Sequence, residues 1–201
     1  MTAIANPNIL QVDMSGMPAR WISIQEAISY YAKGAVLFEL GNPIVTYRGG
    51  HNSLTNTQSE ITANSIIAIN GSVVSSDAYT IVPSLTNEKL FQRDHHLCAY
   101  CGQVFANHRN LSRDHIQPVS KGGQDTWMNA VTSCRPCNGR KADRTPEKAG
   151  MPLLYLPYIP DRFENFILEQ GTRRVLADQM EFLLSRVGKK SRMHQFSNIT
   201  Q

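Results

Sequence analysis

Two CxxC pairs are the part of this chain best suited to binding a metal. Cys98, Cys101, Cys134 and Cys137 are the only cysteines of the sequence. Four thiolates presented by two tight turns form a usual tetrahedral set for structural zinc and leave no position for a reactive water. We therefore predict structural zinc, the alternative being four buried cysteines without metal. A disulfide framework does not suit so few cysteines in a chain of 201 residues.

A second group of polar residues lies between and directly after these pairs. The sequence reads SRDHIQPVSKGG at residues 112–123, Asn129 follows, and CRPCNGRK occupies residues 134–141. These elements, in this order, resemble the HNH nuclease motif in its zinc-bearing form. The resemblance implies an α+β fold with a central ββα-metal module, in which two antiparallel strands and a helix surround one divalent ion.

The resemblance also implies a role for each motif residue. His115 takes the position of the general base, since a neutral imidazole is a suitable base near pH 7. Asp114 and Asn138 offer oxygen ligands, which a catalytic Mg²⁺ or Mn²⁺ prefers. Asn129 takes the position of an organiser whose amide bonds the backbone near the base. Neighbouring residues of a strand point to opposite sides, so Asp114 and His115 should face different surroundings.

One position departs from the family pattern, because Asn138 stands where many members have histidine. Asparagine still offers an oxygen there, although the preferred metal becomes uncertain. Arg113, Arg140 and Lys141 are expected either to contact DNA phosphates or to be solvated surface charges.

The leading hypothesis is a DNA endonuclease that nicks or cuts the duplex and leaves a 3′ hydroxyl. The alternative is a non-catalytic zinc module that binds nucleic acid or a protein partner. Asp114 and His115 favour the enzyme, because a binding module does not need this pair. The target and the role in restriction, homing, packaging or defence stay open, and a double-strand cut would suggest a homodimer.

The distribution of charge is compatible with a polyanionic partner. Residues 89–148 carry 10 basic and 5 acidic side chains, whereas residues 1–88 carry 3 basic and 6 acidic ones. Residues 171–201 carry 6 basic and 2 acidic side chains, so the tail is basic as well. Such a concentration of positive charge indicates either nucleic-acid binding or a solvated basic face.

Other residues near the cysteines are weaker candidates for binding metal or DNA. His95, His96 and His108 lie close to the first CxxC pair, but four thiolates already complete the ligands of a zinc ion. Trp127 could stack on a base, although a buried aromatic side chain under the second pair is favoured.

Residues 1–87 are predicted to form a mixed α/β N-terminal region. SIQEAISYYAKG (residues 23–34) has helical spacing, with Ser23 as a cap and Gly34 at the end. AVLFEL and NPIVTYRG are expected to be two strands around a turn at Gly41-Asn42-Pro43, and SIIAINGSVV two strands joined at Asn70-Gly71.

Residues 88–150 are predicted to hold the nuclease module. A helix is expected over 88–97, a strand, a turn and the start of a second strand over 110–120, and a loop at 122–125. Thr145-Pro146 indicates a short capped helix that ends at Gly150. Residues 151–201 are expected to form a helical C-terminal extension, with Gly171 separating two helices that pack on the nuclease or form a dimer contact.

The chain has the composition of a folded protein that lies outside the membrane. Its hydrophobic fraction is 41% and its charged fraction 18%, and no apolar run reaches the length of about 18 residues that spans a bilayer. The first residues show no signal peptide. We therefore expect an intracellular, cytoplasmic protein of bacterial or phage origin.

Overall fold

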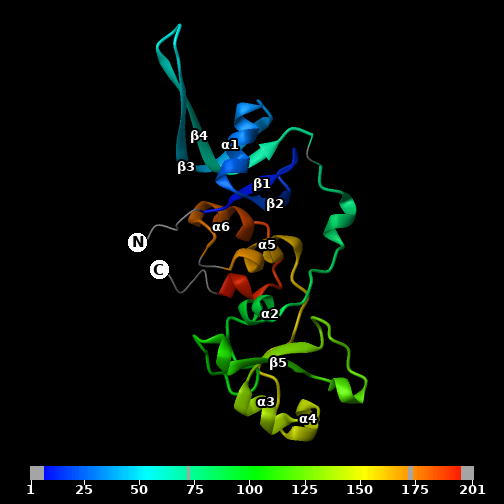
Figure 1. The fold of residues 1–201 in the computed structure, drawn as a ribbon. Helices are drawn as coiled ribbons and strands as arrows, with labels where there is room; N and C mark the ends of the chain where they lie inside the picture. Colours follow the sequence, from blue (N-terminus) through cyan, green and yellow to red (C-terminus); the bar gives the residue numbers. More distant parts are fainter. Residues whose placement is uncertain (1–6, 72, 172–173, 196–201) are drawn as a thin grey trace. The chain divides into compact units, whose positions relative to one another are not determined.

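A computed structural model describes residues 7–71, 73–171 and 174–195 of the chain. The described residues form a mixed α+β structure with six α-helices and two sheets (Figure 1). This confirms the predicted α+β class. The chain divides into two compact units, the first containing residues 1–80 and 172–186 and the second residues 81–171 and 187–201. None of the described helices is long and apolar enough to cross a membrane.

The first unit is built on a four-stranded sheet with the strand order β2-β1-β4-β3. Its strands are β1 (Ile9–Val12), β2 (Pro18–Ile22), β3 (Val36–Asn52) and β4 (Thr57–Ile69). β1 and β4 run parallel, whereas the other pairs are antiparallel. Buried side chains of Ile9, Ile22, Ala27 and Ile67 form part of the core between this sheet and α1 (Ile24–Ala32).

Both helices of the first unit are positioned by side chains at their N-terminal ends. Ser23 caps α1 as predicted, and its hydroxyl accepts a hydrogen bond from the N–H of Glu26. In the first turn of α6 (Ala177–Leu184), the carboxylate of Asp178 accepts hydrogen bonds of 2.6 Å from Asn42 N–H and Ser65 Oγ. The residues from α6 therefore pack with the N-terminal sheet, although they lie more than 100 positions further along the chain.

The prediction of two short strands around Gly41-Asn42-Pro43 is wrong, because β3 runs without interruption through this segment. The chain accommodates the three residues by shifts of register between Leu40 and Pro43 and between Pro43 and Val45. Pro43 can remain in the strand because β3 is at the edge of the sheet, where its missing N–H is tolerated. Gly41 has a φ of +73°, which a glycine adopts without strain.

The predicted hairpin at Asn70-Gly71 is also wrong. β4 ends at Ile69, and within residues 73–80 the structure contains a 3₁₀ turn (Ser76–Tyr79) in place of a strand. The hairpin of this unit joins β3 to β4 through residues 53–56. The partner of β4 thus precedes it in the sequence, so Asn70-Gly71 forms a turn without a following strand.

The second unit contains a two-stranded sheet surrounded by short helices. β5 (Leu111–His115) pairs antiparallel with β6 (Ala130–Cys134), in a register that joins Leu111 to Cys134 and His115 to Ala130. The other elements are α2 (Asn87–Arg93), α3 (Arg135–Lys141), α4 (Pro146–Ala149), α5 (Arg162–Gln170) and 3₁₀ turns at His108–Asn110, Val119–Lys121 and Arg192–Gln195.

Several predictions for the chain from residue 88 onward are confirmed and two are corrected. The loop at 122–125, the capped helix after Thr145, and helices on both sides of Gly171 are present. The second strand starts at Ala130 and not near residue 120. The helix predicted over 88–97 ends at Arg93, because His95 and His96 take positive φ values of 52° and 59° that a right-handed helix excludes.

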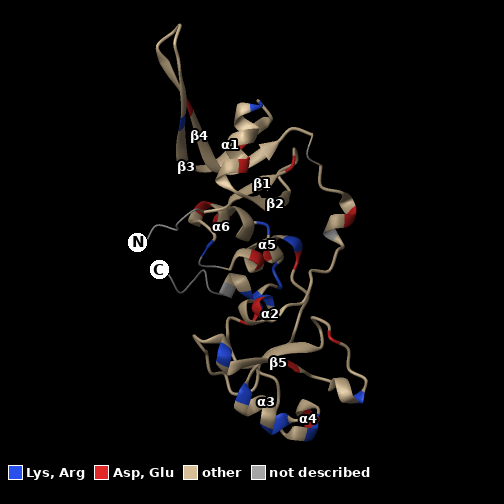
Figure 2. Cartoon of the chain, in the orientation of Figure 1, with Lys and Arg blue, Asp and Glu red and all other residues tan. Residues whose placement is uncertain are grey.

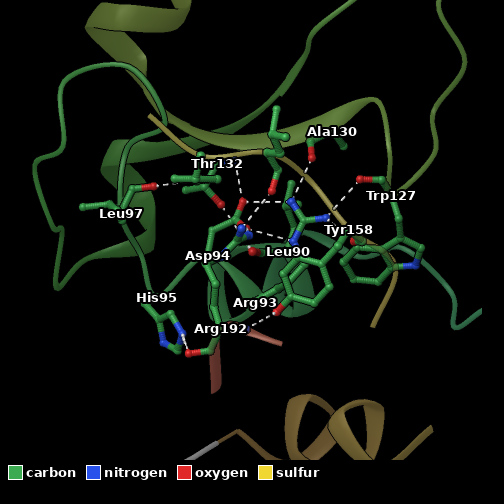
Figure 3. Close-up of polar contacts among 12 residues, drawn as sticks. Leu90, Arg93, Asp94, His95, Leu97, Trp127, Ala130, Thr132, Tyr158 and Arg192 are labelled. Carbon is green, nitrogen blue, oxygen red and sulfur yellow. Dashed lines mark hydrogen bonds and ion pairs between the residues drawn. The ribbon is translucent and has the colours of Figure 1, made fainter. Parts of the chain in front are cut away.

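A buried ionic network holds α2 against β6 (Figure 3). The guanidinium of Arg93 donates to both oxygens of Asp94, at 2.8 and 3.1 Å, and both side chains are fully buried. Arg192 donates to the same carboxylate, and so does the backbone N–H of Thr132 at 2.9 Å. The remaining Arg93 donors reach the carbonyl oxygens of Trp127, Tyr158 and Ala130.

This network leads to a prediction for stability. Replacing Asp94 with Ala should lower the free energy of unfolding by about 3–5 kcal/mol, because it leaves the buried guanidinium of Arg93 and the partly buried one of Arg192 without their anion. Urea denaturation followed by circular dichroism measures the change. Asp143→Ala is the control, since Asp143 forms an exposed pair with Lys121. Equal midpoints for the two variants would contradict the importance of the Asp94 network.

Candidate active site and zinc centre

The four cysteines converge on one point of the second unit. Their Sγ atoms all lie within 4.8 Å of one another, with Cys98, Cys134 and Cys137 buried and Cys101 exposed. The first pair forms a turn closed by a hydrogen bond from Gly102 N–H to the carbonyl of Cys98. The second pair connects the end of β6 to α3. This donor set fits a structural zinc ion, because four thiolates complete its tetrahedral shell.

The environment of Cys98 favours the thiolate that a metal requires. Burial by itself would raise the pKa of this thiol. Backbone hydrogen bonds from Cys134, Cys101 and Tyr100 outweigh burial and lower the pKa to about 7. Burial raises the pKa of the Cys134 and Cys137 thiols, so it is the convergence of the four Sγ atoms that indicates a cation at the cluster.

Asp114 points into the interior from β5. Its Oδ2 accepts a hydrogen bond from the hydroxyl of Tyr100, and its Oδ1 lies 3.0 Å from Nζ of Lys141. The same Nζ donates to the carbonyl of His115 at 2.8 Å. Burial, together with the Asp114 carboxylate, raises the pKa of Tyr100, so its hydroxyl stays protonated and donates. Asp114 and Lys141 thereby form an ion pair that joins β5 to α3.

The expectation that Lys141 contacts phosphate is corrected by this arrangement. Only 1% of its side chain is exposed, and its charge is already paired with Asp114. Asp114 is 5% exposed and has both oxygens engaged. The oxygen atoms of Asp114 are of the kind that a divalent ion prefers. Such an ion would, however, have to displace the ammonium of Lys141 from this carboxylate.

His115 points to the other side of β5 and is 23% exposed. Its Nε2 lies 2.8 Å from Oδ1 of Asp125. The other oxygen of Asp125 accepts from Nη1 of Arg113 at 2.5 Å. These two hydrogen bonds, that from His115 first, hold the pKa of Asp125 below its usual value. In the described residues no hydrogen bond connects the His115 ring to Asp114 or Asn138.

Asp125 is the residue that the sequence analysis missed. It was assigned only to a loop, yet it is the sole acidic residue between His115 and Lys141, and this could have identified it. Arg113, expected at phosphate, instead has internal partners: Nε donates to Asn87 Oδ1 at 3.0 Å and Nη2 to the carbonyl of Leu85 at 3.4 Å.

Asn129 ties together the loop that leads from β5 to β6. Its Oδ1 accepts from the N–H of Gln117 at 2.8 Å, and its Nδ2 donates to the carbonyls of Gln117 and Gln124 at 3.0 and 2.8 Å. Gly123 makes this closure possible, since a Cβ there would lie 1.9 Å from the Gln117 carbonyl oxygen. Asn129 thus contacts backbone on both sides of the turn.

Asn138 and Arg140 occupy different sides of α3. Nδ2 of Asn138 donates to Ser112 Oγ at 2.9 Å and to the carbonyl of Arg113 at 3.5 Å. Within the described part of the chain its Oδ1 has no hydrogen-bond partner, so it can accept a ligand. Arg140 is exposed. The structure therefore brings Asn138 next to β5 and leaves Arg140 accessible to solvent.

The remaining histidines and Trp127 have structural partners. His96 and His108 stack with their ring centroids 4.7 Å apart and their Nε2 atoms 2.7 Å apart, and Nε2 of His95 bonds the carbonyl of Arg192. Trp127 is 2% exposed and donates to the carbonyl of Pro83 at 2.7 Å. Trp127 is therefore a buried side chain in this structure, and its ring is not exposed for stacking on a base.

Comparison with known families identifies the segment that contains these sites. Residues 98–154 match the family model of the HNH endonucleases. The match begins at the first cysteine and includes β5, β6, α3 and α4, so the resemblance stated from the sequence motif is confirmed. Among curated proteins, no match to the chain was found.

The cysteine cluster leads to a test with zinc itself. Cys134→Ser should lose the bound zinc and lower the melting temperature strongly, because metal-binding energy contributes directly to folding at such sites. Zinc per chain is measured by plasma mass spectrometry, and unfolding by calorimetry. His108→Ala is the control for a histidine near the cluster and should keep its zinc. Unchanged zinc content and melting temperature in Cys134→Ser would exclude a four-cysteine site.

Proposed function

We propose that this chain is a metal-dependent DNA endonuclease whose active centre lies on the β5–β6–α3 segment in a ββα-metal arrangement. The supporting observation is that His115, inside an HNH endonuclease match, is held by Asp125 and has its other ring nitrogen available. The four-cysteine cluster joins the turn before β5 to the junction of β6 and α3, and its second pair anchors α3.

His115 acts as the general base in this proposal. The imidazole takes a proton from a water molecule, the water oxygen forms a bond to phosphorus, and the bond from phosphorus to the 3′ oxygen breaks. The electron pair of that bond stays on the 3′ oxygen, which leaves as the hydroxyl after protonation from solvent. A neutral imidazole accepts a proton readily near pH 7.

A divalent ion would supply charge stabilisation of the phosphate and of the departing oxygen. Asp114 and Asn138 are the proposed ligands, and Mg²⁺ or Mn²⁺ matches their oxygen atoms. Asn138 Oδ1 is available for this role, whereas Asp114 must first separate from Lys141. Asn129 holds the loop beside the base and takes no part in proton transfer.

Exposed cations on the same unit offer a surface for the DNA backbone. Figure 2 marks Lys and Arg positions in blue on the ribbons of α3 and α4. The exposed residues of this basic surface are Arg109, Arg135, Arg140, Arg144 and Lys148. Contacts of this kind bind phosphate without reading sequence, so the proposal assigns DNA as the substrate and leaves its sequence open. Two copies would suit a double-strand cut.

The base is tested by His115→Ala. We expect loss of plasmid cleavage with Mg²⁺ or Mn²⁺ while the circular dichroism spectrum and zinc content remain those of the unaltered protein. End mapping should show 3′ hydroxyl products for the unaltered protein. His51→Ala is the control, because His51 is an exposed histidine of the other unit. Full cleavage by His115→Ala would refute the proposed mechanism, and DNA binding without cleavage under any ion would favour the non-catalytic zinc module.

Arg140 provides a test of the basic surface. Arg140→Ala should weaken DNA binding by a similar factor for different sequences and should reduce the slope of log K against log salt by about one. Fluorescence anisotropy with labelled duplexes over a series of salt concentrations measures both quantities. The control is Lys33→Ala, which removes an exposed cation from the first unit. An unchanged salt slope in Arg140→Ala would remove Arg140 from the interface.

A further inference from the structure

We propose that Asp125 is a positioning residue that holds His115 with its proton on Nε2, so that Nδ1 is the atom that accepts a proton. This inference rests on the proposed function and specifies the atom that performs it. The contact that carries it is the 2.8 Å separation between His115 Nε2 and Asp125 Oδ1.

The direction of this hydrogen bond follows from the chemistry of its two groups. An ionised carboxylate can only accept, so Nε2 must carry the hydrogen. The neutral imidazole then has its lone pair on Nδ1, which has no hydrogen-bond partner among the described residues. Asp125 is kept in its ionised form because His115 and Arg113 lower its pKa. The pair therefore selects one tautomer and also one orientation of the ring.

Asp125 can orient the ring only if its own carboxylate is held in place. Arg113 does this from the opposite side, with Nη1 2.5 Å from Asp125 Oδ2. The guanidinium is fixed in turn by Asn87 and by the carbonyl of Leu85. The side chain of Arg113 is only 18% exposed, so little of it remains for a phosphate. A chain of hydrogen bonds thus runs from α2 through Arg113 and Asp125 to the base.

The backbone of the loop supports the same arrangement. Asn129 fixes the carbonyl of Gln124, the residue directly before Asp125, at 2.8 Å. Asp125 itself is 52% exposed, and an ion pair with that exposure contributes little to folding stability. Removing this carboxylate should therefore leave the fold intact and change only the orientation and the tautomer of the His115 ring.

The experiment compares Asp125→Ala and Asp125→Asn in the full chain loaded with zinc. Asp125→Ala should lower kcat by about 100-fold with KM little changed, since small errors in the placement of a catalytic group have effects of this size. Asp125→Asn should retain more activity, because its amide oxygen can still accept the hydrogen of Nε2. Asp143→Ala, which removes another exposed carboxylate of this unit, should keep full activity. Full kcat in Asp125→Ala, or a rise in KM at constant kcat, would overturn the positioning role.

A double variant separates action through His115 from an independent role. His115→Ala combined with Asp125→Ala should be no less active than His115→Ala alone, because a positioning residue has no effect once its target is gone. A further loss of activity in the double variant would show that Asp125 acts on the substrate directly and would overturn the inference.

A readout that does not depend on cleavage distinguishes this inference from the proposed function. Nitrogen-15 spectra of the histidine rings, recorded where His115 is neutral, should show its hydrogen on Nε2 and a change of the ring signals in Asp125→Ala. If the protein cleaves no DNA and this spectrum is observed, the proposed function fails while the pairing stands. A neutral His115 that carries its hydrogen on Nδ1 would overturn the inference even in an active enzyme.

Discussion

The buried ion pair between Asp114 and Lys141 determines how the candidate site is arranged. It joins β5 to α3, and both side chains are almost without solvent contact. A buried charge is costly unless its partner is present. The buried ammonium of Lys141 therefore requires the Asp114 carboxylate to face the interior beside it. Since neighbouring residues of a strand face opposite sides, this places His115 on the surface that the loop with Asp125 covers.

Two further constraints keep these strands and helices together. The four thiols bring the first CxxC turn to the junction of β6 and α3. Behind β6, the carboxylate of Asp94 holds Arg93, Arg192 and the N–H of Thr132 (Figure 3). The small sheet of two strands thus has a four-cysteine cluster at one end and an ionic network along one side, which compensates for its limited hydrophobic core.

The site combines residues that have quite different relations to solvent. Asp114 is neutralised inside the unit and His115 is partly exposed, while Oδ1 of Asn138 has no hydrogen-bond partner among the residues that the structure describes. In the proposed enzyme, Asp114 and Asn138 would hold a divalent ion, which would have to compete with the ammonium of Lys141 for the Asp114 carboxylate. His115, the proposed base, lies on the other face of β5, where its Nε2 contacts Asp125.

Local patterns in the sequence were sufficient for the features that depend on near neighbours. The CxxC pairs, the HNH motif, the Ser23 and Thr145 caps and the helices on both sides of Gly171 depend on residues within a few positions. The pairing of strands depends on distant segments. Thus Gly41-Asn42-Pro43 could not reveal that β3 is one continuous edge strand, and Asn70-Gly71 could not reveal that β4 already had its partners.

The division at residues 87 and 150 follows chain order and stays a prediction, whereas contacts place α6 with the first unit. From the sequence, Lys141 and Arg113 were expected as surface cations, but in the fold each pairs with a carboxylate, Asp114 and Asp125 respectively. A charged side chain reveals its partner only when the fold brings the two together, and for that physical reason the sequence determined the chemistry available to this protein while the tertiary structure decided which groups meet.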